Sequence, residues 1–158
     1  MIWPWTLEVY ARPGVASACL ALQDLDGQNV PYLLWACYGA ERGASQLVLA
    51  AQIAAKWEAA ATSPLRMARR ALKEGVEGID PARSEELRER IRNIELEAER
   101  LLLEALGGPD ETASDREGPA YAELLARLER ASLAYGRPAA HERLEALAET
   151  LTGSAPPP

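Results

Sequence analysis

The feature that most constrains this chain is a run of apolar residues spaced alternately by four and three positions. Its members are Leu87, Ile91, Ile94, Ala98, Leu101 and Ala105. This spacing keeps them on one side of an α-helix and is typical of the seam of a coiled coil or a long helical hairpin. We therefore predict a helix over 82–106. Its short connection at Asp80-Pro81 predicts antiparallel packing against a helix over 64–78.

Helical spacing of apolar residues continues through the rest of the chain. Apolar residues recur every three or four positions rather than every second one, which favours helices over strands. Turn and capping signals, such as Gly27 and the Asn29-Val30-Pro31 segment, separate the helices. The predicted helices span 5–11, 14–26, 29–40, 45–61, 64–78, 82–106, 121–135 and 139–152. The helix after Asn29 is uncharged on every side, so we expect it at the centre of the core.

The predicted fold class is therefore all-α, a compact multi-helix domain with a long antiparallel helical hairpin and C-terminal accessory helices. Residues 107–118 (GGPDETASDREG) contain no large apolar side chain, which is typical of a linker. We predict a helical core domain over 1–106, a flexible linker over 107–117, an accessory helical hairpin over 118–152 and a disordered tail over 153–158. The sequence leaves open whether the hairpin docks on the core.

Composition and charge disfavour two classes of partner. The 158 residues include 17 basic and 24 acidic ones, for a net charge of −7, which disfavours binding to the phosphates of nucleic acid. No apolar run approaches the ~20 residues that cross a bilayer. The first ten residues, MIWPWTLEVY, lack the basic start of a signal peptide. We expect a soluble cytoplasmic protein that binds neither nucleic acid nor membranes.

The residue inventory also excludes several kinds of catalytic site. His141 is the single histidine and lies in the predicted accessory hairpin, so the core cannot hold a Ser-His-Asp or Cys-His arrangement. Cys19 and Cys37 lack CxxC spacing, and we predict that both are buried free thiols. One histidine and two distant cysteines cannot form a tetrahedral zinc site. We therefore predict no catalytic residue, no metal ligand and no cofactor, and whether the protein is an enzyme stays open.

One constellation of charged residues stands out on the helix over 64–78. Four basic residues share a helix face through i, i+3, i+4 and i+7 spacing: Arg66, Arg69, Arg70 and Lys73. If the hairpin turns near residues 80–81, Arg66 faces Glu95 on the partner helix, and Glu99 lies one turn further along. One interpretation is an internal ladder of Arg–Glu pairs that fixes the register of the hairpin. The other is a set of unpaired arginines facing a groove, which would bind an acidic protein partner or an anionic small molecule.

The two interpretations differ in the pairing of the arginines. A ligand site requires at least two of the three arginines to converge without carboxylate partners. Gln23 and Asp24 are a second candidate pair, which either points into a polar pocket or forms a solvated helix end. A third possibility is a homodimer through the helix over 82–106. That dimer predicts that leucines off the predicted seam are exposed, namely Leu102, Leu103 or Leu106.

The motifs in the first two thirds of the chain resemble those of a known family. They read Trp3-x-Trp5-x-x-x-x-Tyr10-x-x-Pro13-Gly14-Val15, Cys19-Leu20-x-Leu22-Gln23-Asp24 and Pro64-Leu65-Arg66-x-x-Arg69-Arg70-x-Leu72-Lys73. In these motifs the chain resembles a family of short proteobacterial proteins that carries a domain-of-unknown-function label. The resemblance covers about residues 3–106 and implies a bacterial cytoplasmic origin, but no activity or catalytic residue. Trp5 and Tyr38 depart from the pattern, which has a Phe-like aromatic and a Trp at or near those positions.

Together these observations predict a non-enzymatic cytoplasmic interaction or regulatory module. The alternative is a protein, or an enzyme, that binds a small anionic molecule in an Arg-lined groove. An interaction module requires a contiguous exposed apolar or basic patch on the folded protein.

Overall fold

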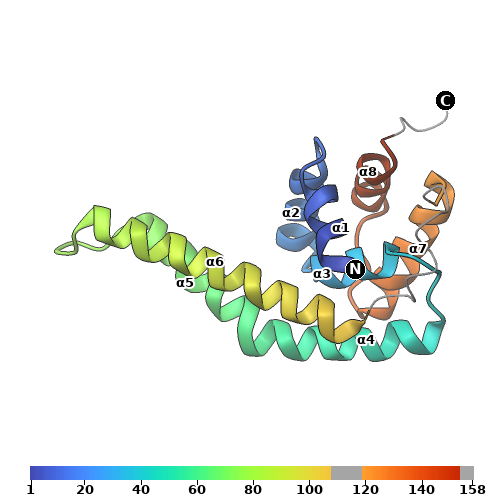
Figure 1. Ribbon diagram of the computed structural model, residues 1–158, viewed down its shortest axis with the longest axis horizontal. Helices are drawn as coiled ribbons and strands as arrows, with labels where there is room; N and C mark the ends of the chain where they lie inside the picture. Colours follow the sequence, from blue (N-terminus) through green and yellow to red (C-terminus); the bar gives the residue numbers. More distant parts are fainter. Residues whose placement is uncertain (108–118, 154–158) are drawn as a thin grey trace.

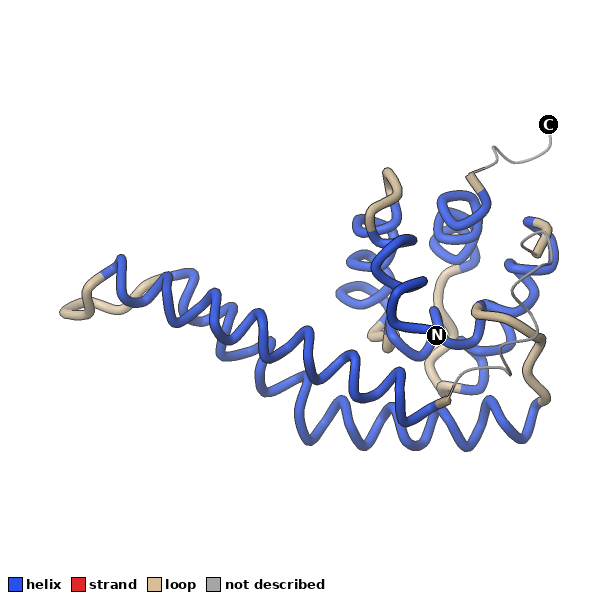
Figure 2. The backbone as a smooth tube through the Cα atoms, in the orientation of Figure 1, coloured by secondary structure: helices blue, strands red, loops and turns tan. Residues whose placement is uncertain are grey.

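The computed structural model describes residues 1–107 and 119–153, and every regular element in those ranges is helical, which confirms the all-α prediction (Figure 2). The elements are α1 (Ile2–Tyr10), α2 (Val15–Asp26), α3 (Val30–Cys37), α4 (Ala44–Trp57), the π-helical turn η1 (Glu58–Thr62), α5 (Ser63–Glu74), α6 (Pro81–Leu106), α7 (Tyr121–Ala134) and α8 (His141–Thr152). The predicted linker and tail, apart from Gly107 and Gly153, lie outside the described residues.

The molecule consists of a helical body and a projecting helical arm (Figure 1). The arm is the pair α5 and α6 with the connection 75–80 between them, and its far end extends well away from the other helices. The body contains α1, α2, α3, α4, α7 and α8, together with the C-terminal part of α6. Because α4 runs through η1 directly into α5, the arm is a continuation of a helix of the body.

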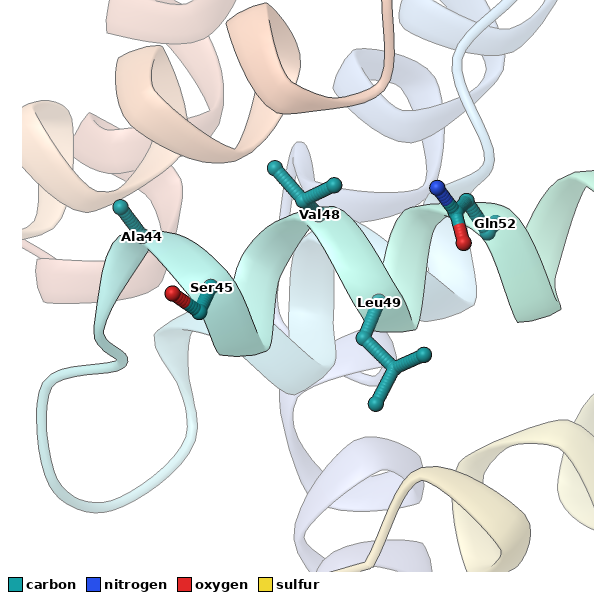
Figure 3. Close-up of a pocket in the computed structure, with 5 residues that line it drawn as sticks. All are labelled: Ala44, Ser45, Val48, Leu49 and Gln52. Atoms are coloured by element: carbon teal, nitrogen blue, oxygen red, sulfur yellow. The ribbon is translucent and has the colours of Figure 1, made fainter.

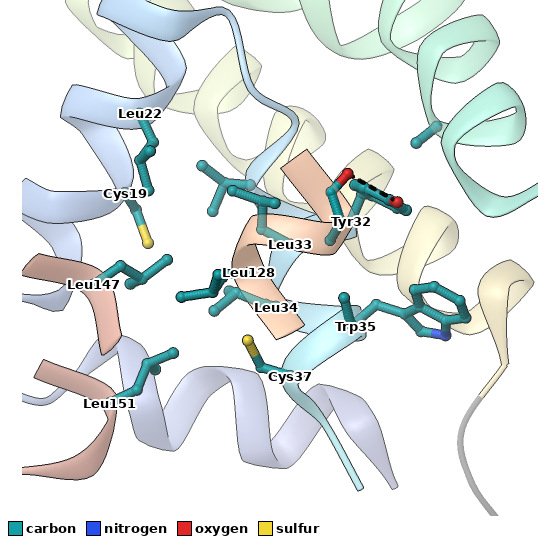
Figure 4. Packing of buried hydrophobic residues seen from close by; sticks show 14 of the residues in the cluster. Cys19, Leu22, Tyr32, Leu33, Leu34, Trp35, Cys37, Leu128, Leu147 and Leu151 are labelled. Atoms are coloured by element: carbon teal, nitrogen blue, oxygen red, sulfur yellow. Dashed lines mark hydrogen bonds between the residues drawn. The ribbon is translucent and has the colours of Figure 1, made fainter. Parts of the chain in front are cut away.

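Helix α3 forms the centre of the core, as its uncharged sequence predicts. All eight of its residues are buried, and it packs against α2, α4, α6 and α7 (Figure 4). Asn29 caps its start by accepting a hydrogen bond of 2.9 Å from the backbone N–H of Tyr32, and Pro31 lies in its first turn. The Tyr32 hydroxyl lies 3.2 Å from the carbonyl oxygens of Leu47 and Ala131, which links α3 to α4 and α7.

The C-terminal helices α7 and α8 pack into the same core as α3. Leu128 of α7 and Leu147 of α8 are fully buried in one cluster with the residues of α3 (Figure 4). Helix α8 packs against α2, where Arg143 donates hydrogen bonds of 2.5 and 2.7 Å to Asp26. The apolar sides of α7 and α8 cover surfaces of α2, α3 and α4 that the body would otherwise expose to water.

Several helix ends differ from the predicted ones for local reasons. Helix α1 begins at Ile2 rather than at residue 5, because Pro4 is tolerated in a first helical turn. Helix α3 ends at Cys37 instead of continuing to residue 40. Helix α5 ends at Glu74 rather than at the predicted residue 78. Gly75 follows it with a positive φ of +75°, which ends the helix.

The predicted seam of α6 is only partly correct. Leu87, Ile94 and Leu101 are 45%, 51% and 50% exposed, whereas Leu102 and Leu103 are 2% and 1% exposed. The inward residues of α6 include Ala98 of the predicted seam, together with Ser84, Glu95 and Leu102 beside it. Leu102 and Leu103 are therefore not exposed as the predicted dimer contact required, and Leu106 is partly buried against the core.

Candidate functional site

The arm joins the body at a partly buried polar cluster centred on Glu58. This residue starts η1, whose wider turn interrupts the α-helical register between α4 and α5. Its carboxylate accepts three hydrogen bonds, from Asn29 Nδ2 at 2.8 Å, Thr62 Oγ1 at 2.9 Å and Arg66 Nη1 at 2.7 Å. Glu58 therefore connects the cap of the central helix α3 to the first arginine of the arm.

Arg66 and Arg69 carry the connection from α5 to α6. Arg66 Nε lies 3.2 Å from Glu95 Oε1, as the register of the hairpin predicts, and Arg69 Nε lies 2.6 Å from Glu95 Oε2. The side chains of Arg66 and Glu95 are 11% and 9% exposed. Arg66 Nη2 also lies 4.0 Å from Glu99 Oε1. We call Glu58, Arg66, Arg69, Glu95 and Glu99 the ion-pair cluster.

The ion-pair cluster holds three carboxylates and two guanidinium groups, so it lacks one positive charge. Burial and the neighbouring carboxylate of Glu95 raise the pKa of Glu99 to about 7, although Arg66 lowers it in part. Burial lowers the pKa of Arg66, but the carboxylates of Glu58, Glu95 and Glu99 outweigh this effect and hold it above its usual value. Arg66 is thus permanently charged, and Glu99 is the member of the cluster that takes up a proton near neutral pH.

The two cysteines are buried free thiols, as predicted. Burial raises the pKa of Cys19 and of Cys37 to about 12, so neither is a thiolate at neutral pH. Tyr10 lies beside Cys19, and burial raises the pKa of its hydroxyl as well. The Tyr10 hydroxyl and the Cys19 thiol, which lie near Glu99 of the ion-pair cluster, therefore stay neutral at neutral pH.

The structure also brings Asp24 and Arg70 together, away from the ion-pair cluster. Arg70 Nη2 donates a hydrogen bond of 2.6 Å to Asp24, and Gln23 Nε2 donates one of 3.3 Å to the same carboxylate. Burial raises the pKa of Asp24, but the hydrogen bonds from Arg70 and Gln23 outweigh it and lower the pKa. The side chains of Arg70 and Asp24 are 51% and 36% exposed, so this pair is a solvated link between α5 and α2. Lys73 is exposed one turn further along α5.

These contacts bear on the two interpretations of the basic face. Arg66, Arg69 and Arg70 each have a carboxylate partner. The groove with converging unpaired arginines, which the anionic-ligand alternative requires, is therefore not formed by these three residues. The arginines instead form the internal ladder that fixes the arm on the body.

Sequence reasoning missed two charged residues that the fold uses. Glu58 stands beside three alanines and fits an ordinary solvent-facing position, because its role depends on the π-helical turn. Arg127 of α7 is 6% exposed and donates hydrogen bonds of 3.2 and 2.6 Å to the carbonyl oxygens of Cys37 and Gly39. Its spacing on α7 resembles that of a surface arginine, and only the docking of α7 on the end of α3 reveals its function.

The second feature of interest is the exposed side of α6. Leu87, Ile94 and Leu101 are seven residues apart and therefore line up along one side of the helix. We call these three residues the α6 row. Exposed leucines scattered singly are ordinary on protein surfaces, whereas these three apolar side chains are aligned along one helix.

The remaining surface features give weaker evidence of a binding site. An open depression on α4 is lined by Ala44, Ser45, Val48, Leu49 and Gln52, none of which carries a titratable side chain (Figure 3). In residues 1–107 and 119–153 no group of histidine, cysteine, aspartate and glutamate side chains is arranged to hold a metal ion. Within the same ranges, no helix combines the length and apolar character that crossing a membrane requires.

Comparison with known proteins gives one match. A model of a family described as a protein of unknown function, DUF2390, matches residues 1–106. The chain belongs to the DUF2390 family. The DUF2390 match contains α1 to α6, so it includes the whole arm, the ion-pair cluster and the α6 row, while α7 and α8 follow it. No curated protein and no solved structure matches the chain.

Proposed function

We propose that this DUF2390 protein is a non-enzymatic interaction module of the bacterial cytoplasm, which presents its helical arm to a protein partner. The observation that carries the proposal is the α6 row, because it places three large apolar side chains about half exposed along α6, from Leu87 on the projecting arm to Leu101 where α6 joins the body. A partner that covers them removes the remaining apolar surface from water, which contributes about 1 kcal/mol for each side chain.

The ion-pair cluster supports this function by fixing the direction of the arm. Arg66 contacts Glu58, which follows α4 of the body, and Glu95 of α6, so one buried guanidinium group links the body and both helices of the arm. A surface held in a fixed orientation loses little conformational entropy when it binds. The cluster is therefore a structural lock, and the α6 row is the surface that it positions.

A photo-crosslinking amino acid placed in the full-length protein tests the proposal. We expect the Ile94 variant to form a covalent protein adduct in cells after irradiation, because position 94 lies at the middle of the α6 row. The matched control is the same substitution at Leu25, which is 69% exposed on α2 and lies outside the arm. Adducts at position 25 but none at position 94 would show that the arm is not the contact surface.

A further inference from the structure

The charges beside the α6 row point to the identity of the partner. We infer that the arm binds a second copy of this chain, with the two α6 helices antiparallel and related by a two-fold axis near Ile94. This inference rests on the proposed function, since it names the partner of the same surface.

The first observation is the order of the charges along the exposed side of α6. Next to the α6 row lies a second line of exposed residues, also seven positions apart, and it reads Arg83, Arg90, Glu97 and Glu104. Its half toward the tip of the arm is basic and its half toward the body is acidic. When a second copy of this line runs alongside in the opposite direction, basic residues of one copy therefore face acidic residues of the other.

An antiparallel pair makes use of this order. With the axis near Ile94, Arg83 of one copy lies alongside Glu104 of the other, and Arg90 lies alongside Glu97. Leu87 then lies alongside Leu101, and Ile94 meets its own equivalent. The same surface serves both copies, as a two-fold contact requires. A parallel pair would instead place equal charges side by side, so the charges select the antiparallel direction.

The position of this surface leaves room for a second copy. Leu103, which packs into the body, lies nine residues after Ile94 and therefore about 180° around the helix from it. Leu103 and the α6 row thus lie on opposite sides of α6, while Trp3 of α1 lies beside Arg100 at the body end of the contact. The charged line from Arg83 to Glu104 is about 30 Å long at 1.5 Å per residue, which is enough for several turns of each helix to touch.

Sedimentation velocity of the full-length protein tests the inference with charge-reversal variants. We expect the unaltered protein to sediment at twice its chain mass of 17.2 kDa. The variant Arg83→Glu/Arg90→Glu carries only acidic residues on the charged line, and the variant Glu97→Arg/Glu104→Arg carries only basic ones. Each should weaken self-association at least about tenfold, because like charges then face each other.

Mixing the two variants provides the decisive control. The acidic line of one variant complements the basic line of the other, so the mixture should form a dimer again. Circular dichroism checks that each variant is folded. A monomeric unaltered protein, a dimer that neither reversal weakens, or a mixture that does not associate would each overturn the inference. A monomer that still forms a crosslink from position 94 to a different protein would overturn the second copy as partner and retain the proposed function.

Discussion

Replacing Arg66 by methionine removes the cation that three carboxylates share. The methionine keeps an apolar side chain of similar length, so the change tests the charge rather than the packing. Glu95 is 9% exposed, Glu99 21% and Glu58 25%, which leaves these carboxylates partly buried with Arg69 as the remaining cation of the cluster.

Breaking a buried pair by removing one partner costs about 3–5 kcal/mol. We expect Arg66→Met to lower the free energy of unfolding by that amount at pH 8. With a urea dependence of about 2 kcal/mol/M, the unfolding midpoint falls by about 1.5–2.5 M. The loss should be smaller at pH 5, because the unpaired carboxylates then bind protons more readily in the folded state than in the unfolded state.

Urea titration followed by circular dichroism measures these midpoints. The matched control is Arg92→Met, whose side chain is 68% exposed and pairs with Glu89 at 3.3 Å on the surface of the same arm. That change should cost less than about 1 kcal/mol. Equal midpoints for the two variants would refute the view that the ion-pair cluster is a buried lock.

Three further predictions concern Glu99 of the ion-pair cluster, the two buried thiols and Gly14. Glu99→Gln should raise the free energy of unfolding at pH 8 by up to about 3 kcal/mol and change it little at pH 5. The reason is that a carboxyl group whose pKa is raised to about 7 in the folded protein lowers the stability of the protein as the pH rises through that value. Urea titration at both pH values measures the difference. Cys19 and Cys37 should react with a thiol reagent at pH 8 only after urea unfolds the chain, and rapid reaction of the folded protein would contradict their burial. Gly14→Ala should lower the midpoint of thermal unfolding, because the new Cβ strains a backbone with φ of +86° and would lie 2.8 Å from Thr150 Cγ2 of α8. Adding Thr150→Ser removes that methyl group and should restore part of the lost stability.

The helices and one contact of the site could be predicted from the sequence, because both depend on local spacing. Apolar periodicity located the elements, and Asn29 marked the start of α3 through its capping side chain. The pairing of Arg66 with Glu95 followed from the length of the connection at the tip of the arm, since a short turn fixes which residues face each other.

The rotation of α6 and the docking of α7 and α8 could not be predicted in this way. Helix α6 carries large apolar residues on two sides, and periodicity alone does not say which side turns inward. Leu102 and Leu103 pack into the body while Glu95 pairs with two arginines, and these non-local contacts turn Leu87 and Ile94 outward. The linker composition gave no information on where the following helices pack.

Cysteine crosslinking at Ile94 tests most directly whether the α6 row is where this protein meets its partner. The native thiols are buried, so a short bifunctional maleimide reports on the introduced cysteine alone. An antiparallel pair centred on this residue predicts efficient crosslinking of Ile94→Cys to a species of twice the chain mass. It also predicts no crosslink for Arg83→Cys, whose two copies lie about 30 Å apart. Crosslinking at position 83 without crosslinking at position 94 would contradict this arrangement.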